Sequence, residues 1–165
     1  EGCIIWDQST ELWHERASHL SPTWRVKHQA ACYGLQLFGS ATDRQIYKLD
    51  ESAYHEDGDI LALEMVTPYA YDAGKRFSVD EIEVVMQSGV GTLTLDPAIT
   101  LARTKDGETW SGAKIRRFGK AGERGKRVLF GAQGQARQMA FRLRITDPVK
   151  RAILGVFAEI DSEAA

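Results

Sequence analysis

The chain has 165 residues, with 43% hydrophobic and 27% charged side chains and a formal net charge of -2. This composition is that of a soluble globular protein with one ordinary core and at most a small second unit, and the net charge favours neither nucleic-acid nor membrane binding. No apolar stretch approaches the roughly 20 residues of a membrane-spanning helix, and residues 1–6 lack the regions of a signal peptide. We therefore expect a cytosolic origin and no membrane partner.

Basic residues are concentrated near the C-terminus. Residues 114–151 contain 12 of the 21 Lys and Arg residues but only two acids, Glu123 and Asp147. This segment therefore carries about +10 and the rest of the chain about -12. The chain is electrically polarised in spite of its small net charge.

Short strands with recurrent aromatic side chains are predicted over the first fifty residues, at 4–7, 12–16, 34–39 and 46–50. The pattern is typical of propeller-blade hairpins, and one or two blades cannot close a ring. We therefore predict a propeller-blade-like β-hairpin segment over 1–54 that leans on the following domain or on further sequence. Because the sequence begins at Glu1 inside an expected strand, we expect it to be a fragment of a longer chain.

Residues 55–165 are predicted to form a β-sandwich. Side chains alternate with a period of two, as in Phe141, Leu143 and Ile145. The segment 152–158 is apolar on both faces, which predicts a central strand. The predicted fold class is therefore all-β, an antiparallel β-sandwich preceded by propeller-blade-like β-hairpins. The strands of the whole region from residue 30 onward are expected at 30–38, 59–67, 82–86, 92–95, 99–104, 110–118, 126–130, 141–145 and 152–160.

The segment from Asp106 to Trp110 predicts a tight turn and resembles the Asp-box hairpin of sialidase-like propellers with one residue fewer. Aspartate can accept backbone N–H bonds across such a turn, and glycine can adopt the positive φ that it needs. Trp110 is expected to anchor the hairpin in the core. We interpret Asp106, Gly107 and Trp110 as a structural turn.

A glycine-rich basic segment runs from Phe118 to Lys126. It lacks the spacing of a phosphate-binding loop, and no convincing helix follows it. Its cations are candidates for contact with a phosphate backbone or an acidic partner, with a solvated loop as the alternative: Lys120, Arg124, Lys126 and Arg127. Other arginines are expected to extend it into a basic face: Arg116, Arg117, Arg137, Arg142 and Arg144.

The sequence predicts no catalytic residue, no metal site and no cofactor. Glu81 and Glu83 alternate with apolar residues, which places both carboxylates on the solvated face of a strand rather than in a hydrolytic pair. Cys3 and Cys32 are expected to be free, packed thiols. The histidines have neither zinc-site spacing with these cysteines nor a hydrolase-type arrangement: His14, His19, His28 and His55.

Several motifs precede a dense C-terminal block. They are Trp13-His14-Glu15-Arg16, Lys75-Arg76-Phe77, Gln87-Ser88-Gly89-Val90-Gly91 and Asp106-Gly107-Glu108-Thr109-Trp110-Ser111. The block contains Phe118-Gly119-Lys120, Gly125-Lys126-Arg127-Val128, Gly134-Gln135-Ala136-Arg137 and the run from Phe141 to Lys150. This order resembles the C-terminal part of the packaged-DNA stabilisation, or tail hub (tail accessory), proteins of short-tailed bacteriophages.

The resemblance implies a structural virion protein of a phage or prophage rather than an enzyme. Its partners would be the head-to-tail adaptor and the tail needle, in a homo-oligomeric ring of the tail that helps to retain packaged DNA. For the basic block, contact with the DNA backbone and contact with an acidic partner both stay open. Two alternatives stay open. One is a carbohydrate-binding β module that uses Trp6, Trp13, Trp24 or Trp110 as a stacking platform. The other is a sequence-neutral nucleic-acid-binding module that rests on the basic block.

Overall fold

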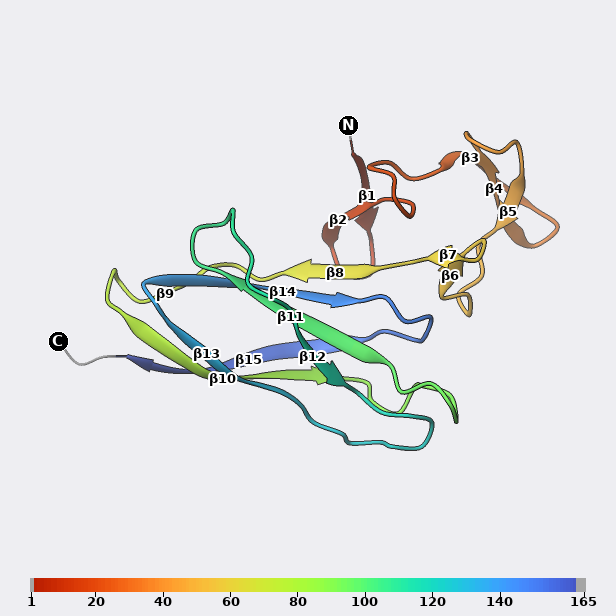
Figure 1. Cartoon of the computed structure of the whole chain (residues 1–165). Helices are drawn as coiled ribbons and strands as arrows, with labels where there is room; N and C mark the ends of the chain where they lie inside the picture. The colour runs from red at the N-terminus through yellow and green to blue at the C-terminus, as the bar shows by residue number, and fades with distance from the viewer. Residues whose placement is uncertain (1, 163–165) are drawn as a thin grey trace. The chain divides into compact units, whose positions relative to one another are not determined.

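The computed structural model describes residues 2–162, and all regular elements in this range are β-strands (Figure 1). The all-β prediction is confirmed. The chain divides into two compact units after Leu61. The predicted division between residues 54 and 55 lies a few residues earlier and stays a prediction. Within residues 2–162, no helix is long and apolar enough to cross a membrane.

The first unit consists of three small antiparallel sheets. β1 (Cys3–Asp7) pairs with β2 (Leu12–Arg16), β3 (Val26–Cys32) is followed by β4 (Leu35–Ser40) and β5 (Ile46–Lys48) in a meander, and β6 (His55–Glu56) pairs with β7 (Asp59–Ile60). The predicted strand 30–38 is the β3–β4 hairpin, because Tyr33 and Gly34 adopt positive φ values of 52° and 72° that suit a two-residue turn. Cys3 and Cys32 are free thiols.

The second unit is a sandwich of two antiparallel sheets (Figure 1). The three-stranded sheet has the order β13 (Val128–Ala136), β10 (Phe77–Met86), β15 (Ile153–Ser162). The five-stranded sheet has the order β12 (Lys114–Arg117), β11 (Ala98–Thr104), β14 (Gln138–Ile145), β8 (Leu63–Val66), and β9 (Ala70–Tyr71) pairs with the start of β14.

The hydrophobic core of the second unit lies between these sheets. Phe77 and Val79 face the core from the first half of β10, whereas Ile82 and Val84 face it from the second half. The change from odd to even positions occurs at a bulge, where the register with β15 shifts between Val79 and Glu81. Buried residues of the other strands and loops complete the core: Ile99, Leu101, Phe118, Val128, Phe130, Met139, Phe141, Leu143, Ile145 and Val149.

Other predicted strands differ from the structure. The predicted strand 59–67 is divided into β7, in the first unit, and β8, in the second, and the predicted strand 110–118 is a strand only at β12. Residues 92–95 form a turn, because the Thr92 hydroxyl accepts hydrogen bonds from the backbone N–H groups of Thr94 (3.3 Å) and Leu95 (2.9 Å). β15 is the terminal strand of its sheet and not the predicted central strand. Some of its apolar side chains therefore face solvent, and Phe157 is 63% exposed.

Two glycine-containing segments meet in what we call the glycine clasp (residues 88–92 and 118–121). The backbone N–H of Gly91 donates to the carbonyl of Gly119 at 3.3 Å, and the N–H of Gly119 donates to the Asp96 carboxylate at 3.1 Å. A Cβ atom on Gly91 would lie 3.0 Å from the Gly119 carbonyl oxygen across the clasp and 2.2 Å from the Leu95 carbonyl oxygen of its own loop. The two backbones can therefore approach this closely only at glycine.

Candidate functional site

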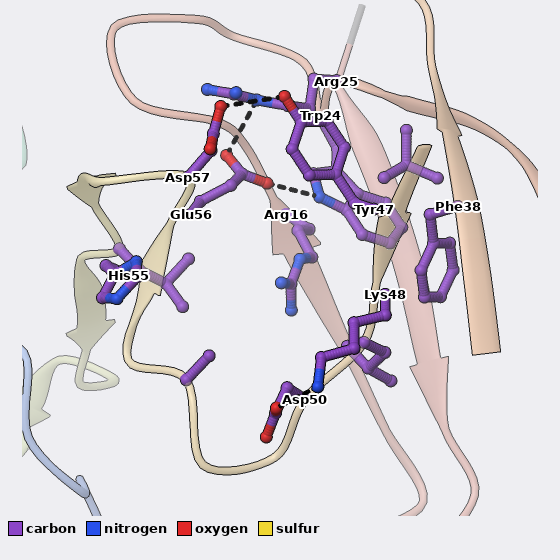
Figure 2. Close-up of a pocket in the computed structure, with 14 residues that line it drawn as sticks. Arg16, Trp24, Arg25, Phe38, Tyr47, Lys48, Asp50, His55, Glu56 and Asp57 are labelled. Atoms are coloured by element: carbon purple, nitrogen blue, oxygen red, sulfur yellow. Dashed lines mark hydrogen bonds and ion pairs between the residues drawn. The ribbon is translucent and has the colours of Figure 1, made fainter. Parts of the chain in front are cut away.

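A pocket in the first unit gathers charged side chains around Arg25 (Figure 2). The Arg25 guanidinium lies 2.7 Å from the Asp59 carboxylate, 3.4 Å from that of Glu56 and 3.9 Å from that of Asp43. Glu56 also accepts a 2.9 Å hydrogen bond from the Trp24 indole. Arg25 therefore connects the segment before β3 to the β4–β5 loop and to both strands of the β6–β7 hairpin.

Tyr47 links two carboxylates at the same pocket. Its hydroxyl lies within hydrogen-bonding distance of Asp43 and, at 3.0 Å, of Asp57, so its single proton is shared between the two carboxylates. The bond to Asp43 raises the pKa of Tyr47 to about 12. Hydrogen bonds with Ser40 and Tyr47 lower the pKa of Asp43 to about 2. At neutral pH the phenol is therefore protonated and Asp43 is ionised.

This pocket is built as a structural ion-pair network. Its volume of about 110 Å³ has room for a few water molecules. Arg16 stacks on the Trp24 ring at 4.7 Å, so the β1–β2 hairpin joins the same cluster. Across residues 2–162, no group of three or more His, Cys, Asp or Glu side chains is placed to hold a metal ion. The network was not predicted, because its residues are scattered along the sequence.

Asp106 organises the turn that precedes β12. Its carboxylate accepts hydrogen bonds from the backbone N–H of Thr109 (2.8 Å), the Thr104 hydroxyl (2.9 Å) and the backbone N–H of Glu108 (3.0 Å). These bonds, that of Thr109 first, lower the pKa of Asp106 to about 2. Gly107 takes a φ of 87° in this turn.

The low pKa values of Asp43 and Asp106 predict acid sensitivity in both units. A folded-state pKa below the usual 3.8 means that the ionised form stabilises the fold, fully above about pH 4 and progressively less as the pH falls to about 2. We expect the unfolding temperature, measured by circular dichroism, to fall in this window. Asp106→Asn lacks the ionisable group in the sandwich. Its unfolding temperature should therefore fall less between about pH 4 and pH 2 than that of the unmodified chain. A fall of equal size in this variant would contradict the assignment.

Arginines of the C-terminal block share the outer face of the five-stranded sheet. Arg142 and Arg144 alternate on β14 with core residues, and Arg117 lies opposite Ala98 on the same outer face. Trp110, which was expected in the core, lies on this face, where the Arg142 guanidinium stacks on its ring at 4.4 Å. Arg116 belongs to the opposite face of β12, since it is paired with the core residue Ile99.

The predicted contact residues of the loop fall into two groups. Lys126 lies 3.4 Å from Glu123 and 3.6 Å from Asp96. Arg127 makes two 2.8 Å hydrogen bonds to Glu83, which lower the pKa of that carboxyl group. The other two, Lys120 and Arg124, are exposed and have no ion pair with any described residue. Of the four predicted contact residues, these two are therefore the ones without an acidic partner among the described residues.

Cationic side chains cap the backbone of β13. Lys114 Nζ donates to the carbonyls of Gly131 (2.6 Å) and Ala132 (2.7 Å). Burial, together with the nearby charges of Arg103 and Arg116, lowers the pKa of Lys114. Arg116 and Lys105 cap two further carbonyls of β13, at 2.8 Å and 2.7 Å. Because β13 ends its sheet, these carbonyls have no partner strand, and the cations protect the edge.

We expect Lys114→Met to lower the free energy of unfolding of the sandwich by about 1–2 kcal/mol, because two backbone acceptors lose a charged donor. Urea unfolding can be followed by fluorine NMR of chains labelled with 5-fluorotryptophan, since Trp110 is the one tryptophan after residue 61. Lys120→Met is the matched control and should change stability little. Equal effects of the two substitutions would show that the cap does not stabilise the sandwich.

These features define an all-β protein whose larger unit is a two-sheet β-sandwich. The family model described as Bacteriophage P22 Gp10, beta-sandwich, matches residues 62–161, which is more than half of the chain. The chain therefore belongs to this family and is a structural protein of a bacteriophage tail. The resemblance inferred from the sequence is confirmed. No curated protein gives a significant match to the chain.

Proposed function

We propose that this chain is part of the tail hub or neck of a short-tailed phage, where it joins the portal-side adaptor to the tail needle and helps to retain packaged DNA. The observation that carries the proposal is the family match, which spans nearly the whole sandwich. The work is mechanical, without catalysis or a cofactor. The 62–162 sandwich serves as a separate rigid body that is joined to a hairpin segment.

The charge distribution supports a role in protein assembly. Arg117, Arg142 and Arg144 lie on the outer face of the five-stranded sheet, and the outer face of the three-stranded sheet carries Glu81 and Glu83. Complementary charge on neighbouring subunits steers and aligns contacts of this kind. Copies arranged in a ring would present each face to a different neighbour.

Contact with packaged DNA forms the second part of the proposal. Lys120 and Arg124 are the exposed, unpaired cations of the glycine-rich loop, whereas Lys126 and Arg127 have acidic partners within the chain. Contacts through such side chains go to phosphates and carry no sequence information. The proposed DNA contact is therefore weak, sequence-neutral and sensitive to salt.

The carbohydrate-binding alternative has one observation in its favour. Trp6 and Trp13 are 44% and 68% exposed on the β1–β2 hairpin. Their rings, however, pack on each other with centroids 5.1 Å apart and an interplanar angle of 50°. A cross-strand pair of this kind stabilises its own hairpin, and its tilted rings do not form a flat stacking platform.

Light scattering with the adaptor and needle proteins tests the proposal. The purified chain is measured alone, with each protein and with both, in low and moderate salt, with a DNA titration alongside. We expect complexes with the adaptor and a weak DNA association that moderate salt removes. A chain that ignores both proteins but binds glycans or DNA tightly would replace the hub assignment with a binding module.

A further inference from the structure

An apolar groove runs along one side of the sandwich, between β15 and the β8–β9 segment. Its volume is about 490 Å³. Leu154 and Val156 line it from β15, and Tyr69 lines it from the loop between β8 and β9. The core residues Ile82 and Phe141 also contribute to the lining. The groove therefore opens the hydrophobic core to the surface along the edge of the three-stranded sheet.

β15 offers an unprotected backbone edge beside this groove. It is 10 residues long, pairs with β10 on one side, and has no strand on its other side among residues 2–162. Leu154, Phe157 and Ile160 are 76%, 63% and 46% exposed. Soluble proteins usually protect such edges with charged side chains, Pro, bulges or a covering segment. β15 contains neither Lys nor Pro, its register with β10 shifts at two points, and its two charged side chains, Glu159 and Asp161, lie near its end, so residues 153–158 carry no charge. The opposite terminal strand, β13, carries this protection as its cationic cap.

The charge beside the edge specifies what would bind there. Glu159 on β15 lies directly opposite Glu81 on β10, and like charges in this arrangement destabilise a sheet. Asp161 follows two residues later on the same face. Neither Glu159 nor Asp161 has an ion pair with any described residue. Basic side chains from a neighbouring strand would relieve this repulsion.

We propose that β15 and its groove bind an extended segment of another tail protein by strand addition. In an added strand, side chains alternate between the two faces of the sheet. Apolar residues at every second position enter the groove, and Lys or Arg residues between them face Glu159 and Asp161. This inference rests on the proposed function in one respect: the added strand comes from a neighbouring protein of the tail.

Hydrogen exchange of the full chain with synthetic peptides tests this mode of binding. The probe is a capped peptide of alternating valine and lysine with the same 10-residue length as β15, and alternating valine and glutamate is the matched control. The valine–lysine peptide should slow exchange of the outward amides of β15 at least about tenfold. The valine–glutamate peptide should slow this exchange only when it is added to the double variant Glu159→Lys, Asp161→Lys of the chain.

Strand addition has a further signature in the peptide backbone. Successive backbone N–H groups of a strand point to opposite edges. N-methylation of all valine residues therefore removes the hydrogen-bond donors of one edge of the peptide, and N-methylation of all lysine residues removes those of the other edge. One methylated peptide should bind and the other should not. Leu154→Asp should abolish the protection, whereas Leu93→Asp, at a leucine that is 86% exposed and outside the groove, should not.

Three results would overturn the proposal. They are unchanged exchange of β15 with the valine–lysine peptide, equal binding of both methylated peptides, and β15 amides that are already protected in the free chain by the first unit or a second copy. The experiment needs neither the adaptor nor the needle protein. Failure of strand addition and failure of the hub assignment are therefore distinguishable.

Discussion

Gly91→Ala is expected to lower the free energy of unfolding of the sandwich by about 2–4 kcal/mol. The added Cβ would lie 2.2 Å from the Leu95 carbonyl oxygen, 2.7 Å from Pro97 Cδ and 3.0 Å from the Gly119 carbonyl oxygen. Two of these three contacts are with backbone atoms, so a rotamer change cannot relieve the clash. The glycine clasp must open, and its hydrogen bonds must lengthen. The measurement is urea unfolding of the full chain with fluorine NMR of Trp110.

Gly112→Ala is the matched control for this substitution. A Cβ on Gly112 meets no atom within 4 Å, and Gly112 is not among the positive-φ glycines of residues 2–162. Its stability should therefore stay the same or rise slightly, because alanine restricts the unfolded chain. If both substitutions cost the same, the close approach at Gly91 does not hold the sandwich together.

Arg25→Met is expected to destabilise the first unit by about 3 kcal/mol. The side chain of Arg25 is 14% exposed, and its removal leaves Asp59, Glu56 and Asp43 without their shared cation. Mutual repulsion of these carboxylates should loosen the β6–β7 hairpin from the β3–β5 meander. Fluorine NMR of labelled Trp24, which contacts Glu56, reports this loss during urea unfolding.

Two control variants separate this network from a general effect of lost charge. Lys27→Met removes an exposed cation from β3 and should have little effect. Arg25→Lys keeps the charge but loses the planar fork of donors, so it should recover only part of the stability. Full recovery by lysine would mean that charge alone, and not the geometry of Arg25, holds the hairpins.

The strands could be predicted from the sequence because alternation has a direct physical cause in the two faces of a sheet. β10, β11 and β14 follow this rule, and their apolar positions form the core. The rule is less informative for a segment that is apolar on both faces. β15 was predicted to be central, but the same pattern suits an edge strand that presents apolar side chains at the surface.

The sites were harder to predict because they depend on pairing between distant residues. Lys126 and Arg127 appeared available by sequence. Glu123, three residues from Lys126, is a local partner, but Asp96 and Glu83 are distant in sequence, and Glu83 is 44 residues from Arg127. Local charge counting cannot detect such a partner. The Arg25 network was missed for the same reason.

The cationic cap on β13 also limits how copies of this protein can aggregate. Open fibrils grow when each sheet offers two free edges, one to receive a strand and one to continue the ladder. Lys114, Arg116 and Lys105 already occupy carbonyls along β13, so the three-stranded sheet can lengthen only at β15. Pairing of β15 with the β15 of a second copy would therefore leave only the capped β13 edges at both ends and stop growth of this sheet. A tail protein that is crowded among many neighbours can in this way keep one strand unpaired without forming fibrils.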